Sequence, residues 1–235
     1  MTRRRFIADE VEGDRAALLG GHAAHLSKVL RAQIGQQFDI AANSSVRRGE
    51  ITGITNERVD FLLGEAVANA ATQREVTLLL SIFRFDRMEW AIEKATELGV
   101  AHIVPVIARR TEPHLASAAD KRVERWRRIA REASQQSRRS AEPVVSDPLK
   151  LKDILASTQD FRILLSEHES PARTSLKQLV NDHHEPLTLA IGPEGGWTDE
   201  ELELFQQNSW QFASLGSTIL RAETAVIAAL ALAIS

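Results

Sequence analysis

The sequence contains no cysteine, so it forms neither a disulfide bond nor a metal site with thiolate ligands. It also lacks an apolar stretch of about 20 residues, the length that a membrane-spanning helix needs. The longest apolar run, residues 225–234, is instead predicted to be a buried helix. No apolar segment follows the arginines at positions 3–5, which argues against a secretory signal. We therefore expect a cytoplasmic protein with no membrane partner.

The net charge is only −3, which by itself gives no indication of a nucleic-acid partner. The positive charge is nevertheless concentrated before residue 140, above all in residues 121–139, whereas acidic residues gather in the last third of the chain. Such a distribution could place a basic face against RNA phosphates. The same residues could equally form a solvated helix face.

Residues 1–70 are predicted to form a small β-sheet or barrel, because short strands alternate there with turn residues. Residues 37–42 are one expected strand, and residues 49–63 alternate in hydrophobicity on both sides of a turn at Thr55–Glu57. The small and uncharged segment 66–72 is the predicted linker to a second domain.

After this segment, strands alternate with helices, which is typical of an α/β domain with a mainly parallel sheet. Asp86 and Glu89 predict a capping box at the start of its first helix, and Gly99 predicts the end of that helix. Strands are expected at 76–83, 102–107, 161–165, 187–191 and 212–215, and further helices at about 118–137, 149–156, 175–180, 199–208 and 223–234.

Three loops follow expected strands of this domain, at the sheet edge where open α/β folds bind ligands. They span residues 165–169, 191–198 and 215–224. In the second loop, Gly192, Gly195 and Gly196 could let a ligand approach the backbone, although such a turn also occurs without any ligand. The loop matches neither of the glycine motifs for dinucleotides and triphosphates. Thr198 and Glu201 predict a capping box for the helix that follows.

Arg221 and Glu223 begin the last expected helix. An arginine keeps its proton, so Arg221 could hold a phosphate or stabilise a developing anion. Glu223 could orient Arg221 or accept a proton. The two residues could also be an ordinary surface ion pair.

Five separated segments contain recognisable motifs. They read LAIGPEGG at 189–196, LGxxILRxETA at 215–225, MExxIxKxxELGV at 88–100, WxxIAxEA at 126–133 followed by Gln136 and Ser137, and HLxKVLRxxxG at 25–35. In their order along the chain they closely resemble the motifs of the 16S rRNA uracil-N3 methyltransferase family (RsmE) of the SPOUT superfamily. The resemblance extends over essentially the whole chain.

The resemblance implies a PUA-like β-barrel over residues 1–70 that binds RNA. It implies, over residues 73–235, a SPOUT-type α/β domain with a C-terminal trefoil knot that binds S-adenosylmethionine near the interface of a homodimer. No metal is expected, because the sulfonium is already an activated electrophile. The cofactor residues implied by the matching motifs are Leu165, Ser166, Glu167, Ile191, Gly192, Pro193, Glu194, Gly195, Gly196, Leu215, Gly216, Ile219, Leu220 and Thr224.

The implied reaction is methylation of uracil N3 in the 16S rRNA of the small ribosomal subunit. Arg221 is expected to stabilise the negative charge on the uracil oxygens, and Glu223 to position Arg221. Contacts that set the register of the RNA are expected from Lys28, Arg31, Arg84, Arg87, Arg109, Arg128, Arg138 and Arg139.

One turn departs from the family pattern. Gln135 and Arg138 stand where the family usually has a glutamate and a glycine, which weakens the case for a substrate role of that turn. Two other functions remain open from the sequence: a SPOUT methyltransferase for tRNA, and a non-catalytic RNA-binding assembly factor. A phosphotransferase is disfavoured, since no lysine follows the glycine loop.

Overall fold

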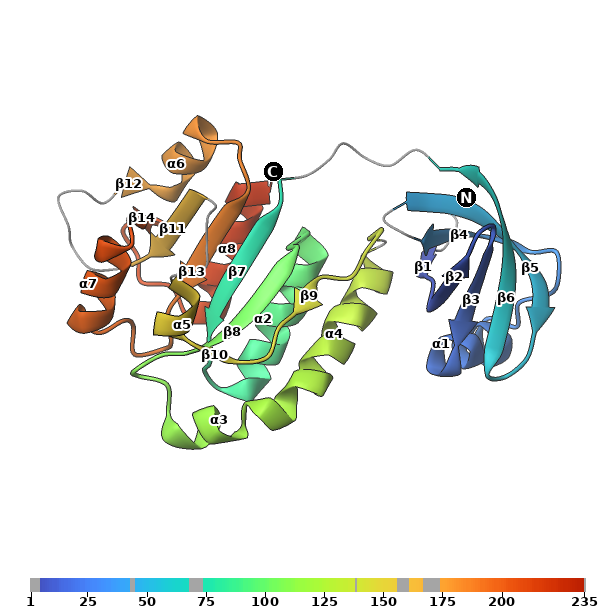
Figure 1. The fold of residues 1–235 in the computed structure, drawn as a ribbon, viewed down its shortest axis with the longest axis horizontal. Coiled ribbons are helices and arrows are strands. Elements are labelled where there is room, and N and C mark those ends of the chain that lie inside the picture. The colour runs from blue at the N-terminus through green and yellow to red at the C-terminus, as the bar shows by residue number, and fades with distance from the viewer. Residues whose placement is uncertain are drawn as a thin grey trace. The chain divides into compact units, whose positions relative to one another are not determined.

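The computed structural model describes residues 5–42, 45–67, 74–137, 139–155, 161–166 and 174–234 (Figure 1). The chain divides into two compact units. Unit 1 comprises residues 1–72 and 134–142, and unit 2 comprises residues 73–133 and 143–235. Most of the predicted linker 66–72 lies outside the described residues.

Unit 1 contains a mixed six-stranded sheet with the order β1-β4-β5-β6-β3-β2. β1 and β4 are parallel, and the other neighbours are antiparallel. The strands are β1 Arg5–Ile7, β2 Glu10–Glu12, β3 Arg15–Leu19, β4 Gln37–Ala42, β5 Ser45–Ile54 and β6 Arg58–Ala66; the helices are α1 Gly20–Ala24 and a π-helix at His25–Val29. The predicted turn joins β5 to β6, where Thr55 N donates to Arg58 O at 2.8 Å.

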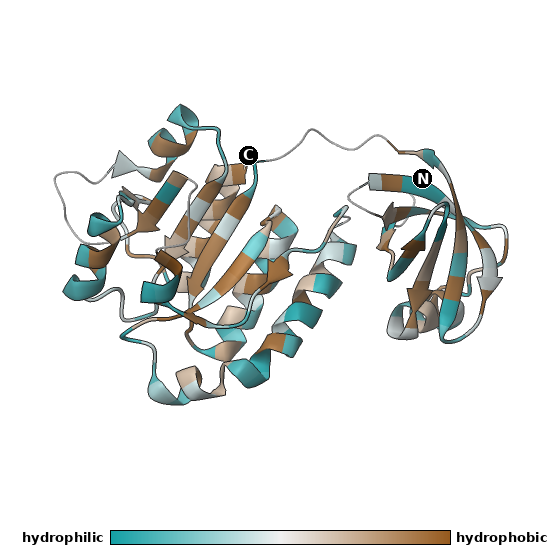
Figure 2. Ribbon diagram, viewed as in Figure 1, coloured by the Kyte–Doolittle hydropathy of each residue, from teal (hydrophilic) through white to brown (hydrophobic). Residues whose placement is uncertain are grey.

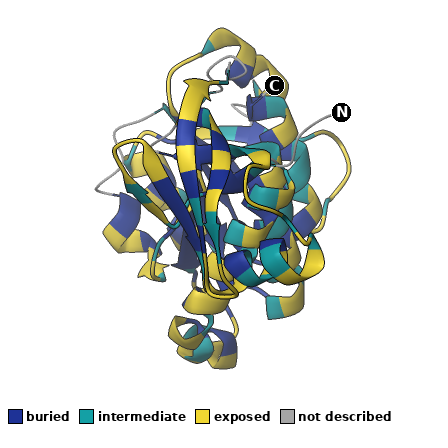
Figure 3. Ribbon diagram, turned by 90° about the vertical axis from the view of Figure 1, so that its right-hand side faces the viewer, coloured by how far each residue is buried: buried dark blue, intermediate teal, exposed yellow. Residues whose placement is uncertain are grey.

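The core of unit 1 follows from the period-2 pattern of its strands. Ile51, Val59, Phe61 and Leu63 are buried, whereas their neighbours along β5 and β6 are largely exposed. Figure 3 shows this alternation of buried and exposed residues along the strands. One face of the sheet therefore covers apolar side chains, as a half-buried antiparallel sheet requires.

Unit 2 contains an eight-stranded sheet whose paired strands are all parallel. The order is β10-β8-β7-β13-β11-β14-β12, and β9 pairs with β8. The strands are β7 Val76–Ser81, β8 His102–Ile107, β9 Val144–Val145, β10 Leu149–Lys150, β11 Phe161–Leu165, β12 Thr174–Ser175, β13 Leu187–Ile191 and β14 Gln211–Ser214. Helices cover the sheet, and its central strands are almost continuously apolar (Figure 2).

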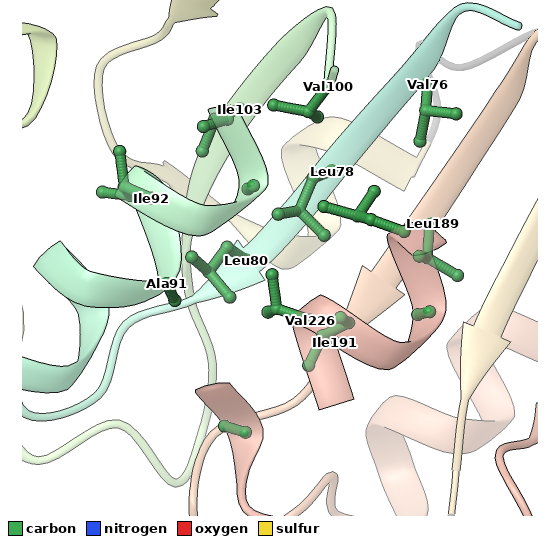
Figure 4. Close-up of a cluster of buried hydrophobic side chains, with 14 of the residues drawn as sticks. Val76, Leu78, Leu80, Ala91, Ile92, Val100, Ile103, Leu189, Ile191 and Val226 are labelled. Atoms are coloured by element: carbon green, nitrogen blue, oxygen red, sulfur yellow. The ribbon is translucent and has the colours of Figure 1, made fainter. Parts of the chain in front are cut away.

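The helices of unit 2 cover both faces of this sheet. They are α2 Phe85–Leu98, α3 Pro113–Ala118, a 3-10 helix at Asp120–Arg122, α4 Val123–Gln136, α5 Leu151–Leu155, α6 Leu176–Asp182, α7 Asp199–Gln207 and α8 Ala222–Ile234. Leu78 and Leu80 of β7 pack against Ile92 of α2 and Val226 of α8 (Figure 4). Leu79, between them, belongs to the opposite cluster with Phe205 of α7. In the described part of the chain, no helix is long and apolar enough to cross a membrane.

The start of α2 differs from the prediction. The capping box from Asp86 and Glu89 is wrong: Arg84 occupies the N-cap position without a side-chain cap. The Asp86 carboxylate accepts hydrogen bonds from Arg84, and Glu89 accepts one from Arg125 at 2.6 Å. Asp86 lies inside the first turn, where its negative charge still interacts favourably with the helix dipole and stabilises the helix. Gly99 ends the helix with a φ of 110°, as predicted.

Other boundaries differ by small amounts. The strand expected at 76–83 ends at residue 81, and the strand expected at 212–215 is shifted by one residue. The helix expected at about 118–137 is divided into α3, the 3-10 helix and α4, and the short strand β10 precedes α5.

Candidate active site

The turns after β11, β13 and β14 line one cavity of about 690 Å³. β11 lies between β13 and β14 in the parallel sheet, so the carboxyl ends of the three strands meet at one edge. The predicted cofactor residues that line the cavity are Leu165, Ser166, Ile191, Gly192, Pro193, Glu194, Gly195, Gly196, Leu215, Gly216, Ile219 and Leu220. Thr224 does not line it and lies exposed on α8, and Glu167 lies outside the described residues.

The glycine loop, residues 192–196, has the shape of a tight turn. Gly196 has a φ of 71°, a region that residues with a side chain rarely adopt, and its N–H donates to Pro193 O at 2.8 Å. A Cβ on Gly192 would lie 3.0 Å from Trp197 Nε1, and one on Gly195 would lie 3.4 Å from Arg110 Cδ. Trp197 and Arg110 therefore leave little room for a side chain at positions 192 and 195, without any ligand being present.

The residues that follow the glycine loop are held by aromatic packing and by the N-terminal cap of α7. The Trp197 and Phe205 rings meet edge to face with centroids 4.9 Å apart, and Phe205 meets Trp210 at 5.0 Å. The predicted capping box at the start of α7 is confirmed. The Thr198 hydroxyl accepts from Glu201 N, and the Glu201 carboxylate accepts from Thr198 N at 2.9 Å.

Arg87 and two carboxylates form an ion-pair cluster beside the cavity. Arg87 Nη1 lies 3.2 Å from Glu194 Oε1 and 3.6 Å from Glu223 Oε1. The Glu223 side chain is only 11% exposed, and its Oε2 is buried with no hydrogen-bond partner among the described residues. Arg87 is predicted as an RNA contact, and the structure places it in the lining of this cavity.

The expected pairing of Arg221 with Glu223 is not formed. Arg221 lines the cavity, is exposed and has no ion pair within the described part of the chain, whereas Glu223 pairs with Arg87. Residues two apart at the start of a helix point in different directions, which explains why the carboxylate does not reach Arg221.

Arg110 is a cavity residue that the sequence did not reveal. Its Nη1 donates to Gly195 O at 2.6 Å. Arg110 follows β8, another strand of the same parallel sheet. Because open α/β sheets bind ligands at the carboxyl ends of their strands, the sequence could have indicated Arg110. The other lining residues that were not named as cofactor contacts are Trp197, Leu202, Ala213, Ser214, Ser217, Thr218, Ala222 and Ala225, of which Trp197, Ser217, Thr218 and Ala222 lie within the predicted loops.

The predicted RNA-contacting residues are distributed over both units. Lys28 and Arg31 are exposed in unit 1, and Arg84, Arg109 and Arg128 are exposed in unit 2. The last three already have carboxylate partners, namely Asp86 at 3.1 Å, Glu200 at 3.8 Å and Glu132 at 3.9 Å. Exposed pairs of this kind are weak, so a phosphate can replace the carboxylate.

Of the remaining two arginines, the structure describes only Arg139. Arg138 lies outside the described residues. Arg139 belongs to unit 1, where burial lowers the pKa of its guanidinium below the ordinary value.

Gln135, the residue that departs from the family pattern, makes a contact within unit 1. Its Nε2 lies 2.8 Å from His22 Nε2, and His22 Nδ1 lies 3.2 Å from Asp9 Oδ2. An amide that donates to Nε2 requires the tautomer with its proton on Nδ1, facing Asp9. A glutamate at position 135 could not donate this hydrogen bond.

Comparisons with known proteins show which proteins this chain is similar to. A family model described as an RNA methyltransferase domain matches residues 70–234. Ribosomal RNA small subunit methyltransferase E of Rickettsia conorii is 30% identical over 223 residues, which cover 94% of this chain and 89% of that relative. The Bacillus subtilis protein of the same name is 29% identical over 228 residues, which cover 93% and 89%.

A crystal structure shares the whole fold. It is that of a ribosomal RNA small subunit methyltransferase E from Neisseria gonorrhoeae bound to S-adenosyl methionine. The two chains superimpose with a TM-score of 0.84 at 27% sequence identity, over 98% of this chain and 96% of the other.

Proposed function

Because this chain belongs to the RNA methyltransferase family that includes ribosomal RNA small subunit methyltransferase E, we propose that it methylates N3 of a specific uridine in 16S rRNA with S-adenosylmethionine. The observation that supports this most is the convergence of three strand-end turns on one cavity. Two of the five sequence motifs that resemble the family, at 189–196 and 215–225, provide two of these turns.

The residues present suit this cofactor. A cavity of about 690 Å³ lies within the roughly 300–1,000 Å³ of ordinary ligand pockets. Leu165, Ile191 and Leu215 offer apolar surface, and the turns offer backbone groups to an adenine. Glu194 lines the cavity and brings a carboxylate close to a ligand that carries a sulfonium. When bound, S-adenosylmethionine supplies an activated methyl group, so no metal is required.

Arg221 is the residue we assign to the uracil. It lines the cavity and has no ion pair in the described structure, so its guanidinium is available to the uracil oxygens as negative charge develops on them. Glu223 holds Arg87 rather than Arg221, and Arg87 in turn reaches Glu194 of the glycine loop. Glu223 therefore contributes to the site through Arg87.

The wider organisation is also part of the proposal. Residues 1–70 would be a PUA-like barrel that binds RNA, and residues 73–235 a SPOUT domain with a C-terminal trefoil knot, in a cytoplasmic homodimer. Support comes from the mixed sheet of unit 1, from the parallel sheet of unit 2 and from exposed Lys28 and Arg31 on unit 1.

The test uses small ribosomal subunits from a strain that lacks this gene. The wild-type protein should add one methyl group, and mass spectrometry of digested 16S rRNA should place it on N3 of a uridine. Arg221→Ala should reduce the rate about 10²–10³-fold, the usual effect of losing one group that stabilises a developing anion, while cofactor affinity stays unchanged.

The two alternatives predict different products. Methyl transfer to tRNA but not to the subunit would favour a tRNA methyltransferase. No methyl transfer and no binding of S-adenosylmethionine would favour a non-catalytic assembly factor. Either result would reject the proposal.

A further inference from the structure

The turn after β8 is fixed by its own hydrogen bonds. Ala108 N donates to Thr111 Oγ1 at 3.1 Å, and Thr111 N donates back to Ala108 O at 3.1 Å. Thr111 is buried, and its hydroxyl also donates to Ile82 O at 3.3 Å, just after β7. Residues 108–111 therefore have one defined conformation at the carboxyl edge of the sheet.

Glu201 connects this turn to the start of α7. Its side chain is buried and uses both carboxylate oxygens. Oε2 accepts from Thr198 N at 2.9 Å, and Oε1 accepts from Arg109 N at 2.8 Å. Glu201 thus does more than close the capping box of α7, because it also fixes the backbone that carries Arg110.

Arg110 extends this connection to the glycine loop. Its Nη1 donates to Gly195 O at 2.6 Å, and a Cβ on Gly195 would contact the Arg110 side chain at 3.4 Å. The aliphatic part of Arg110 therefore lies over Gly195 while the guanidinium holds the carbonyl. Gly195 is thus one of the two central residues of the turn 193–196, and Arg110 fixes it from outside the loop.

We infer that Arg110 and Glu201 are positioning residues that hold the glycine loop in the conformation that receives the cofactor. A loop with three glycines within five residues loses much conformational entropy when it becomes ordered. If the free protein already has the loop ordered, binding does not incur that cost and is tighter. The inference rests on the proposed function, because it takes the occupant of the loop to be S-adenosylmethionine.

The first experiment compares Arg110→Ala with wild type in the absence and in the presence of cofactor. In the ligand-free protein, the hydrogen-exchange rate is measured at the Gly196 amide, which donates a hydrogen bond to Pro193 O at 2.8 Å. Calorimetry measures affinity for S-adenosylmethionine and S-adenosylhomocysteine. We expect faster exchange at Gly196 and an affinity about 10- to 100-fold lower for both ligands, the equivalent of one charge-assisted hydrogen bond.

Arg109→Ala is the matched control for these two measurements. It removes the neighbouring guanidinium, which is 73% exposed, but keeps the backbone N–H that donates to Glu201. Both the exchange rate of Gly196 and the cofactor affinity should match wild type. Arg110→Lys keeps one donor and should restore part of the Gly196 protection, which separates loss of the hydrogen bond from misfolding.

The second experiment compares Glu201→Gln with Glu200→Gln. A glutamine has one acceptor and one donor where Glu201 has two acceptors, so it loses either the Thr198 or the Arg109 hydrogen bond. Glu201→Gln should change both readouts in the same direction as Arg110→Ala. Glu200 is 79% exposed, and its variant should behave as wild type.

The outcomes separate the inference from the proposed function. If wild type does not bind S-adenosylmethionine, the proposed function fails. If wild type binds and Arg110→Ala binds equally well, the inference fails. Lower affinity with unchanged Gly196 exchange in the free protein would mean that Arg110 contacts the ligand directly, which also overturns a positioning role. If the inference holds, Arg110→Ala raises the KM for the cofactor and leaves the KM for RNA unchanged.

Discussion

Arg87 and Arg221 line the same cavity, but only Arg87 is held by carboxylates. Glu223 is mostly buried, so the cation beside it offsets the cost of removing its charge from water. Arg221 has no ion pair in the described structure and is exposed to solvent. The two arginines should therefore contribute very differently to the stability of the free protein.

Arg87→Ala should lower the free energy of unfolding by about 1–3 kcal/mol, because it leaves a mostly buried carboxylate without its cation. Arg221→Ala should change it by no more than about 0.5 kcal/mol, as is usual at an exposed site. Denaturant unfolding of both variants checks this. Equal effects would mean that the Arg87–Glu223 pair does not stabilise the fold.

The glycines of the loop can be tested in the same way. Gly196→Ala should cost about 1–2 kcal/mol, because φ of 71° is unfavourable for a residue with a Cβ. Gly21→Ala is the control: Gly21 lies in helix α1 with open space around its Cα, so the same change should stabilise by up to about 1 kcal/mol. Unfolding measurements that show the same sign for both would contradict this explanation of the loop.

The sequence predicted which residues gather at the cavity better than it predicted their partners. A motif after a parallel strand indicates the edge on which it lies, so Gly192 to Gly196 and Leu215 were found. The contacts of Arg110 with Gly195 and of Arg87 with Glu223 join residues far apart in the chain, and no local pattern encodes them.

At the scale of elements, the hydrophobicity pattern was most informative for the largely buried strands of the parallel sheet. β8, β11 and β13 match their predicted ranges because their mostly apolar segments have clear ends. β1, β2 and β9 have only two or three residues each, too few for any period to show. The start of α2 was misassigned because an acid in the first turn resembles a cap in sequence.

Helix α8 provides the test at this scale. It follows the third turn of the cavity directly and packs against α2 and β13, and its Leu230 is fully buried. Leu230→Ala should destabilise the protein by about 2–5 kcal/mol, as large-to-small changes in a core do. Leu204→Ala, on the exposed side of α7, should cost no more than about 0.5 kcal/mol. Thermal and denaturant unfolding compare the two, and a small effect at Leu230 would argue against the packing described.

At the scale of the whole molecule, the sequence predicted two parts but not how the chain divides between them. Residues 134–142 belong to unit 1, although they follow 61 residues assigned to unit 2 from 73 to 133. No change of composition marks this return of the chain. The basic segment 121–139 therefore extends over both units, and part of its charge is paired within the protein, as between Arg127 and Asp147 at 2.9 Å.

The RNA contacts proposed for unit 1 have a measurable signature. Replacing Lys28 and Arg31 together by alanine should weaken RNA binding and reduce the slope of log affinity against log salt by about 0.7–0.9 for each phosphate that is no longer neutralised. Arg15→Ala, another exposed cation of unit 1, should leave the slope unchanged. Cofactor affinity should not change in either variant. An unaltered slope in the double variant would remove Lys28 and Arg31 from the interface.

A crystal structure of the protein grown with S-adenosylmethionine tests the central claim most directly. The ligand should contact the turns after β11, β13 and β14 together, with its sulfonium on the side of Glu194 and Arg221. Density for the cofactor at any other place, or a cavity that stays empty at saturating ligand, would contradict the account.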